Sequence, residues 1–525
     1  MHTDRYNGPV MTRRTLLGAT ALGIGTLMLT ACTTPGTTKG AATERAGRAA
    51  RMTIGTRPQN SLNPALVNHV AMVQRLVYDG LLGFDAAGKI VGVLADSFEW
   101  ADDAFTTVDL TLKPGLLFSD GDALDADAVV KSFTYFQKAA GPEASLYRGI
   151  AAKKTGDMSV RFRSETSNPD LPFMLTNVYY GGSVISPTGV SNPGSLETES
   201  HGIGPYVYGT MKAGVEYQLV ANDKYFDASR VHFDKIVLPI LDTEAAQTQS
   251  LMAGQCDLTY GGTLTASWTS VTTSSSLTLT LGTPAWAGLN LLDRTGQLVP
   301  ALGNQKVRQA IMYALDRKAI TEAVYGSDAS PRVQPANESW LGFDSSLEST
   351  YGYDLEKAKK LLEEAGYAKG FTLPVAVAAG DVGETLLQAM DGYLRKVGIS
   401  LDIKTTTDIS ALITLLNSGS IAGTSFPTNG QYSVAQLIDS YFTENAGLNP
   451  LHQVDDRLLA LYTAARQSNA KEDWTAVIAY LNEQALTIPI SNTPDAWISR
   501  DTVDVGGAYN SKAGIFDVTQ IAAAQ

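Results

Sequence analysis

Cys32 and the residues before it are the sequence feature that most constrains where this chain folds and works. Cys32 directly follows residues 15–31, a stretch of apolar and small residues that carries no charge. Arg13 and Arg14 precede that stretch. A basic segment, an apolar segment and a small-residue site in this order are typical of an export signal. The chain is therefore expected to work outside the cytoplasm, after residues 1–31 have been removed.

The residues around the cleavage site indicate how the chain is exported and held. Leu29-Thr30-Ala31-Cys32 resembles a bacterial lipoprotein box, in which the cysteine becomes the new N-terminus and carries lipid. Thr12-Arg13-Arg14-Thr15-Leu16-Leu17 resembles a twin-arginine signal, which implies export of a folded chain, although general secretion stays open. The alternative is an uncleaved membrane anchor, but residues 15–31 are at the short end for a span. We expect lipid on Cys32 to anchor the chain to the outer face of the cytoplasmic membrane.

Cysteine content and size together limit how the exported chain can be stabilised. With Cys32 assigned to lipid, Cys256 is the one cysteine left, so an internal disulfide is excluded. The free energy of folding must then come from buried apolar area. Nearly 500 residues exceed what one core holds, so the sequence predicts at least two lobes.

Charge and histidine content exclude several classes of partner. The formal net charge of the whole sequence is −13, and removing residues 1–31 makes the chain more acidic. An acidic chain is repelled by the negatively charged phosphate backbone of DNA or RNA, so nucleic acid is not expected as a partner. The four histidines that remain are not spaced as metal-ligand pairs, so neither a metal nor another cofactor is expected.

The body of the chain mixes strand and helix patterns. Alternating apolar residues at 108, 110 and 112 predict a strand, and Asp125 and Asp354 are expected to cap amphipathic helices. Residues 307–324 predict one interrupted helix or two consecutive helices that end at Gly326. Residues 32–50 predict a flexible tether, and the Ser/Thr-rich residues 263–283 predict a loop or a lobe boundary. Further strands are expected at Ser159–Arg163, Glu216–Ala221, Lys235–Leu241, Phe371–Val377 and Ser400–Lys404.

Several short motifs lie in order over residues 54–500. They include Ser61-Leu62-Asn63-Pro64, Val77-Tyr78-Asp79-Gly80-Leu81-Leu82, Phe118-Ser119-Asp120-Gly121, Gly202-Ile203-Gly204-Pro205-Tyr206, Asn222-Asp223-Lys224-Tyr225-Phe226, Leu251-Met252-Ala253-Gly254-Gln255-Cys256-Asp257-Leu258 and the segment 358–367. Together they resemble family 5 of the extracytoplasmic solute-binding proteins of ABC importers, a group that handles peptides, nickel chelates and some sugars. Each motif also has a structural explanation, such as a turn at Asp120-Gly121. We expect the motifs to identify the family without marking the pocket.

The resemblance implies an α/β fold with two lobes, the Venus-flytrap fold of periplasmic binding proteins (type II, cluster C), with an extra inserted domain. Lobe I would take residues 51–82, 200–282 and 491–525, and the extra domain would be residues 83–199. Lobe II would take residues 283–490, and the crossovers near 282 and 490 would be the hinge strands. Ligand would bind between the lobes and bring them together.

The resemblance also implies which segments line the ligand cleft. Trp286, Phe426 and Tyr432 could stack on an apolar or sugar-like ligand, or each could be a core residue. His69 is either a ligand contact or an ordinary surface or core histidine. The complete set of expected cleft residues is Asn68, His69, Tyr260, Gly261, Gly262, Trp286, Asn290, Phe426, Asn429 and Tyr432.

The last of these segments departs from the family pattern. Peptide binders of the family usually place an aspartate there to pair with the α-ammonium of the peptide, but residues 422–432 contain no acid. A buried ammonium group without a counter-charge is costly. The segment therefore predicts a pocket that does not read a free N-terminus and prefers a neutral or anionic solute.

The function that the resemblance implies is capture of a small-molecule or peptide ligand and its delivery to an ABC permease, by a monomer that performs no bond chemistry. No catalytic residue is expected, because neither a Gly-x-Ser-x-Gly elbow nor a His-Glu-x-x-His helix is present. Gly83 to Lys89 matches a phosphate-binding loop in part, but Ile90 replaces the hydroxyl residue that would hold Mg²⁺. A solute sensor or a surface-binding lipoprotein on the same scaffold remains an alternative, since fold does not determine function. A secreted hydrolase is a further alternative, which the missing catalytic motifs do not favour.

Overall fold

The structure, a computed structural model, describes residues 48–67, 71–139, 141–263, 271, 273–327, 329–379, 382–425, 431–510 and 513–524. The chain divides into two units, Met1–Arg45 and Ala46–Gln525, and the first lies outside the described residues. The export signal, Cys32 and most of the expected tether therefore stay predictions. At the end of the expected tether, Ala49 forms a parallel bridge with Phe233.

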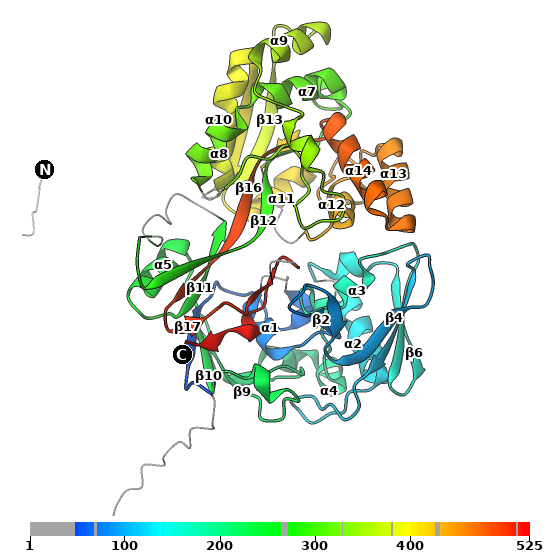
Figure 1. The fold of residues 1–525 in the computed structure, drawn as a ribbon, viewed down its shortest axis with the longest axis vertical. Coiled ribbons are helices and arrows are strands. Elements are labelled where there is room, and N and C mark those ends of the chain that lie inside the picture. Colours follow the sequence, from blue (N-terminus) through cyan, green and yellow to red (C-terminus); the bar gives the residue numbers. More distant parts are fainter. Residues whose placement is uncertain are drawn as a thin grey trace, which may run out of the picture. The chain divides into compact units, whose positions relative to one another are not determined.

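One ten-stranded sheet runs through the second unit (Figure 1). β12 has 15 residues and β16 has 14, and the two pair antiparallel along most of their length. They carry the sheet from one hydrophobic core to the other. In sheet order the strands are β14 Ile399–Thr406, β13 Phe371–Ala378, β15 Gly423–Thr424, β12 Leu277–Leu291, β16 Thr487–Arg500, β11 Leu258–Thr263, β1 Met52–Gly55, β10 Lys235–Pro239, β9 Glu216–Ala221 and β8 Tyr206–Lys212.

The first core is built by side chains from Met52–Leu258 and Val503–Ile521. From here on, lobe I means the residues around this core, which include the region 83–199 that was expected as a separate inserted domain. It includes a four-stranded antiparallel sheet in the order β4-β5-β7-β6, against which α2 packs. α2 begins where Asp125 Oδ1 accepts a hydrogen bond from Ala128 N at 2.8 Å, and it buries Val129, Phe133 and Phe136. The elements are α1 Met72–Val77, β2 Leu82–Phe84, β3 Ile90–Gly92, β4 Ala95–Trp100, β5 Thr107–Leu112, α2 Ala126–Lys138, β6 Ile150–Gly156, β7 Ser159–Ser164, α3 Leu171–Met174, α4 Pro187–Ser191 and α5 Glu244–Met252.

The second core lies within residues 287–490, which we call lobe II. β13 has helices on both faces, because Val375 and Val377 join a core with α7, α8 and α10 while Ala376 joins a core with α11. A separate cluster packs α12, α13 and α14 together. The helices are α7 Gln305–Ala314, α8 Arg317–Tyr325, α9 Leu355–Glu364, α10 Val382–Leu394, α11 Ile409–Asn417, α12 Val434–Tyr441, α13 Asp456–Ser468 and α14 Lys471–Glu483.

Most of the local expectations are confirmed, and one was wrong in part. Residues 305–325 form two helices, since Asp316 accepts a hydrogen bond from Ala319 N at 3.1 Å and starts α8, and Gly326 ends it with φ of 81°. Residues 277–282 were expected in a loop or lobe boundary but belong to β12. The physical reason is that Leu277, Leu279 and Leu281 alternate and pack against buried residues of β16.

The two-lobed α/β fold is therefore present, while the residue boundaries of the lobes stay predictions. β12 and β16 cross the expected boundaries near 282 and 490 as continuous strands, so no break in the backbone marks them. Among the described residues no helix is both long and apolar enough to cross a membrane.

Candidate ligand-binding site

Five of the six expected site residues that the structure describes lie on two strands of the ten-stranded sheet. Tyr260, Gly261 and Gly262 belong to β11, while Trp286 and Asn290 belong to β12, and both strands pair with β16. Tyr432 precedes Ser433, the residue that caps α12. The remaining four expected residues, Asn68, His69, Phe426 and Asn429, lie outside the described residues.

The end of β11 carries a bulge that presents an aromatic face. Tyr260 pairs with Trp497 and Gly262 with Ala496, which leaves Gly261 as the extra residue. A bulge bends its strand and redirects side chains. The Tyr260 ring lies 5.2 Å from the Trp497 ring, and Trp497 stacks on Phe516 at 4.0 Å with the planes 7° apart. The first two rings are half-buried against the first core, while Phe516 is 7% exposed, so the row presents part of an apolar face for stacking.

Sequence reasoning missed Trp497 and Phe516. A signal for Trp497 was present, because Ala496 and Ile498 are buried and a strand turns the residue between them to the opposite face. Phe516 lies in the two-residue strand β19, Ile515–Phe516, which carries too little periodicity to be recognised.

The two expected residues of β12 differ in what they offer a ligand. Trp286 is 2% exposed, which favours its interpretation as a core residue. Asn290 is also 2% exposed, between Thr424 of β15 and Thr487 of β16, and neither its Oδ1 nor its Nδ2 has a hydrogen-bond partner. A buried amide without partners is costly. A ligand that hydrogen-bonds Asn290 would remove that cost.

Tyr432 brings lobe II into contact with lobe I. Its ring lies 5.2 Å from Phe173 and 6.1 Å from Tyr179, and it packs against the first core. Its backbone N–H donates to Gln436 Oε1 at 2.8 Å, which fixes the residue at the start of α12. Phe173 and Tyr179 lie within residues 83–199, which were expected to form the inserted domain, and neither was expected near the site.

A cation lies beside this aromatic contact. Arg75 of α1 is half-buried, and its Nη1 donates to the Phe516 carbonyl oxygen at 3.2 Å. Burial alone would lower the pKa of the Arg75 guanidinium, but Tyr180, Tyr432 and Asp517 outweigh burial, so the pKa is raised. Arg75 is therefore charged at any physiological pH.

A second constellation resembles a catalytic triad but has a structural role. His201 Nδ1 lies 2.7 Å from Asp120 Oδ2, and His201 Nε2 lies 2.8 Å from Ser195 Oγ. The Ser195 hydroxyl donates its proton to the Asn192 carbonyl oxygen at 2.8 Å. In a catalytic triad the serine would instead donate this proton to the histidine. His201 is 1% exposed and Ser195 9%, so substrate has no access. The cluster joins the Asp120-Gly121 turn to the glycine-rich bend that follows His201.

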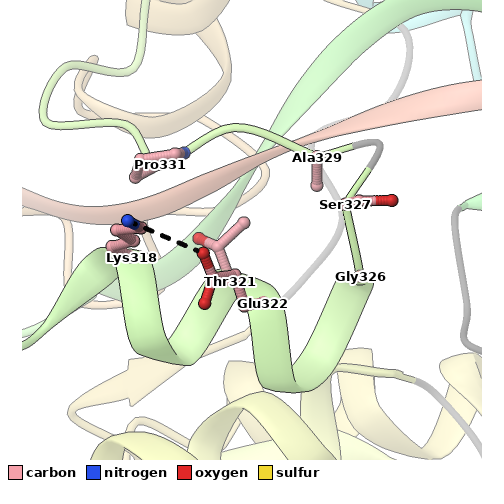
Figure 2. Close-up of a pocket in the computed structure, with 7 residues that line it drawn as sticks. All are labelled: Lys318, Thr321, Glu322, Gly326, Ser327, Ala329 and Pro331. Atoms are coloured by element: carbon pink, nitrogen blue, oxygen red, sulfur yellow. Dashed lines mark ion pairs between the residues drawn. The ribbon is translucent and has the colours of Figure 1, made fainter.

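A pocket of about 520 Å³ opens beside α8 in lobe II (Figure 2). Its volume would suit a small ligand. However, Lys318 and Glu322 face each other across 4.0 Å with side chains 79% and 64% exposed, so the charges are solvated. A ligand there would contact one lobe and would not bridge the two. The lining residues, none of which was expected at the site, are Lys318, Thr321, Glu322, Gly326, Ser327, Ala329 and Pro331.

Comparison with known proteins assigns the chain to a family. Residues 89–446 match the model of the bacterial extracellular solute-binding proteins, family 5, middle region. The chain belongs to this family. This chain is 27% identical over 346 residues to the glutathione-binding protein GsiB of Pectobacterium atrosepticum. The match covers 63% of this chain and 64% of that relative. It therefore spans less than two thirds of the length of this curated relative.

Solved structures with the same fold extend over nearly all of the chain. AgaA of A. tumefaciens R10, in complex with agropinic acid, has a TM-score of 0.76 at 18% identity and covers 91% of this chain and 99% of its own. CtaP of Listeria monocytogenes, an ABC transporter substrate-binding protein, has a TM-score of 0.76 at 23% identity and covers 91% and 100%. These similarities show that the chain has the bilobal binding-protein fold.

Proposed function

We propose that this family 5 protein is an exported, lipid-anchored receptor that captures a small solute and delivers it to the permease of an ABC importer. The observation that carries the proposal is the pair of long strands β12 and β16, which join the two cores within one sheet. Strands that continue from one lobe to the other can act as a hinge. A solute that contacts both lobes would stabilise their closed arrangement, which the permease would recognise.

The solute would lie against the aromatic row of Tyr260, Trp497 and Phe516. This row supplies the apolar surface, and the unpartnered amide of Asn290 supplies a donor and an acceptor from the neighbouring part of the sheet. A few polar groups beside an apolar surface are the usual composition of a small-molecule site. The cleft that these residues would form is part of the proposal.

The solute would be neutral or anionic. Residues 422–432 hold no acid that could pair with an ammonium group, and Arg75 lies near Tyr432 with its charge retained. Guanidinium groups pair well with carboxylates. A buried carboxylate, Glu143, also reaches this region, where its Oε2 accepts from Tyr180 N at 3.3 Å. Arg75 and Glu143 can each be replaced by a neutral residue in separate variants. Loss of affinity on replacing Arg75 would indicate an anionic group on the solute, and loss of affinity on replacing Glu143 would indicate a cationic group.

The charge of the solute can be tested by calorimetry. A thermal-shift screen over peptides, oligosaccharides and metal chelates first provides a bound compound. We expect capping of its carboxylate to weaken binding about tenfold, and Arg75→Gln to weaken binding of the uncapped compound by a similar factor, because a charge-assisted pair is lost. Glu143→Gln is the matched control and should leave the affinity within about threefold. Micromolar binding of unmodified di- to pentapeptides that is lost on N-acetylation would contradict the proposal.

The lipid anchor has its own test. Cys32→Ala should release the protein from the membrane or leave the precursor uncleaved, because lipid attachment and processing both require the thiol. Cys256→Ala is the matched control, since Cys256 is buried and free and should not affect anchoring. Fractionation of cells followed by immunoblotting measures both outcomes. Processed Cys32→Ala protein that stays at the membrane would count against the anchor.

A further inference from the structure

The two lobes contact each other at a second place, away from the long strands β12 and β16. Ser167 Oγ of lobe I donates to the carbonyl oxygen of Arg466 in α13 at 2.6 Å. Tyr179 OH of lobe I donates to Gln436 Oε1 in α12 at 3.1 Å. We call this contact, between residues 167–179 of lobe I and the α12–α13 region of lobe II, the latch. Both hydrogen bonds join residues of different lobes, so both exist only while the lobes are together.

Aromatic rings also join the lobes at the latch. The Tyr432 ring of lobe II lies 5.2 Å from the Phe173 ring and 6.1 Å from the Tyr179 ring, and it packs against the core of lobe I. The Phe173 ring lies in turn 5.8 Å from the ring of Phe84 in β2. A residue of lobe II is thus seated on an aromatic surface of lobe I. Ring pairs of this kind are stabilising beyond the apolar area that they bury.

The lobe II side of the latch is held in place by hydrogen bonds at the start of α12. Ser433 caps α12 by accepting from Gln436 N at 3.1 Å, and its hydroxyl donates to Asp170 Oδ2 of lobe I. Gln436 Oε1 accepts from the backbone N–H of Tyr432 at 2.8 Å as well as from Tyr179 OH. The start of α12 therefore presents the Tyr432 ring and the acceptor for Tyr179 as one preformed unit. Preformed groups lose less conformational entropy when they make a contact.

We propose that the latch closes the two lobes in the absence of solute, so that the empty protein populates the closed arrangement as well as the open one. The latch contacts join protein groups directly and need no ligand to form. Opening the lobes would replace them by contacts with water. The loss of one neutral hydrogen bond in this way shifts an equilibrium about two- to tenfold. The two neutral hydrogen bonds and the ring contacts therefore all favour closure.

Closure without solute changes how the proposed receptor would bind its ligand. The apparent affinity of a protein whose binding-competent state is partly populated is reduced by the populated fraction. A latch that raises the closed fraction therefore raises the affinity for any solute that binds between the lobes, whatever its chemistry. This consequence rests on the proposed function, whereas closure of the empty protein does not.

Pulsed electron paramagnetic resonance on the solute-free protein tests the latch. Spin labels at Lys153→Cys in lobe I and Glu472→Cys in lobe II, both exposed positions, report the distance between the lobes in a Cys32→Ser background. Refolding from guanidinium removes any solute that was purified with the protein. We expect a closed, short-distance population beside an open one when the latch is intact. Ser167→Ala and Tyr179→Phe should each lower the closed-to-open ratio about two- to tenfold, because each removes one hydrogen bond between the lobes.

Two further variants are the matched controls, because each removes a similar hydroxyl hydrogen bond within one lobe. Ser191→Ala removes a bond to the Pro187 carbonyl oxygen at 2.8 Å in lobe I. Tyr313→Phe removes a bond to the Thr350 carbonyl oxygen at 3.3 Å in lobe II. Both should leave the closed-to-open ratio unchanged. Latch variants that keep the ratio of the unmutated protein, or an unmutated protein without a closed population, would overturn the proposal.

Discussion

Asp79→Ala is expected to lower the free energy of unfolding of lobe I by about 3–5 kcal/mol. Asp79 is 1% exposed, and its Oδ2 accepts from Tyr225 OH and from Arg230 Nη1, the latter at 3.1 Å. Arg230 Nη2 in turn donates to Thr519 Oγ1 at 2.8 Å. Removing the carboxylate leaves the Arg230 guanidinium, 16% exposed, with Asp517 at 3.9 Å as its remaining counter-charge. A buried charge that loses its partner is among the most destabilising changes.

A double-mutant cycle separates this cause from the loss of packing. Arg230→Met removes the stranded charge, so the Asp79→Ala/Arg230→Met protein should be more stable than Asp79→Ala alone. Urea unfolding followed by fluorescence and circular dichroism measures each free energy. If the double variant loses the sum of the two single losses, the pair is not coupled and the explanation is wrong.

Arg294→Met is expected to destabilise lobe II by about 2–4 kcal/mol. The Arg294 side chain is buried and donates to the carbonyl oxygens of Leu291 at 2.8 Å and Tyr441 at 2.9 Å, and to Asn449 Oδ1 at 2.9 Å. It also lies over the Phe442 ring, 4.7 Å from the centroid. Methionine fills most of the volume but removes all three hydrogen bonds, and of the three acceptors Asn449 Oδ1 keeps a second donor, the Gln453 N–H at 3.2 Å. Burial lowers the pKa of Arg294 to about 10, so the arginine is still charged at neutral pH.

Arg395→Met provides the matched control in the same lobe. Arg395 lies 2.5 Å from Asp391, but its side chain is 62% exposed, and exposed ion pairs contribute about 0–1 kcal/mol. Thermal unfolding of both variants should therefore show a large loss for Arg294→Met and a small one for Arg395→Met. Equal losses would indicate that burial of the guanidinium is not the cause.

Local features of the fold were predictable because each depends on a few neighbouring residues. The cap at Asp125, the break between α7 and α8 at Asp316 and the alternation of β5 involve contacts within about four residues. The strand at 277–282 was not predicted, since its partner β16 lies about 200 residues further along the chain. A Ser/Thr-rich segment becomes a strand when a distant strand covers its leucines.

The candidate site was predictable only in part, for the same reason. The family resemblance places Tyr260 and Asn290 at the site, but the unpartnered amide of Asn290 and the stacking of Trp497 on Phe516 depend on strands that meet in three dimensions. Asp120 and Asp79 both lie in family motifs and were interpreted as scaffold. Nothing in those motifs indicated that Asp120 joins His201, or that Asp79 joins Arg230.

By itself the amino-acid sequence indicated the family, the expectation of an export signal and of two lobes, and most helix and strand positions, because these follow from ordered motifs, chain length and short-range periodicity. Only the tertiary structure decided which charges are buried, which aromatic rings form one face, and that Asp170 meets Ser433 across the lobes. Contacts such as those of Tyr260 with Trp497 and of Asp170 with Ser433 join residues more than 200 positions apart, and no local pattern encodes them. Their energies depend on removal from water, which is a property of the folded chain as a whole.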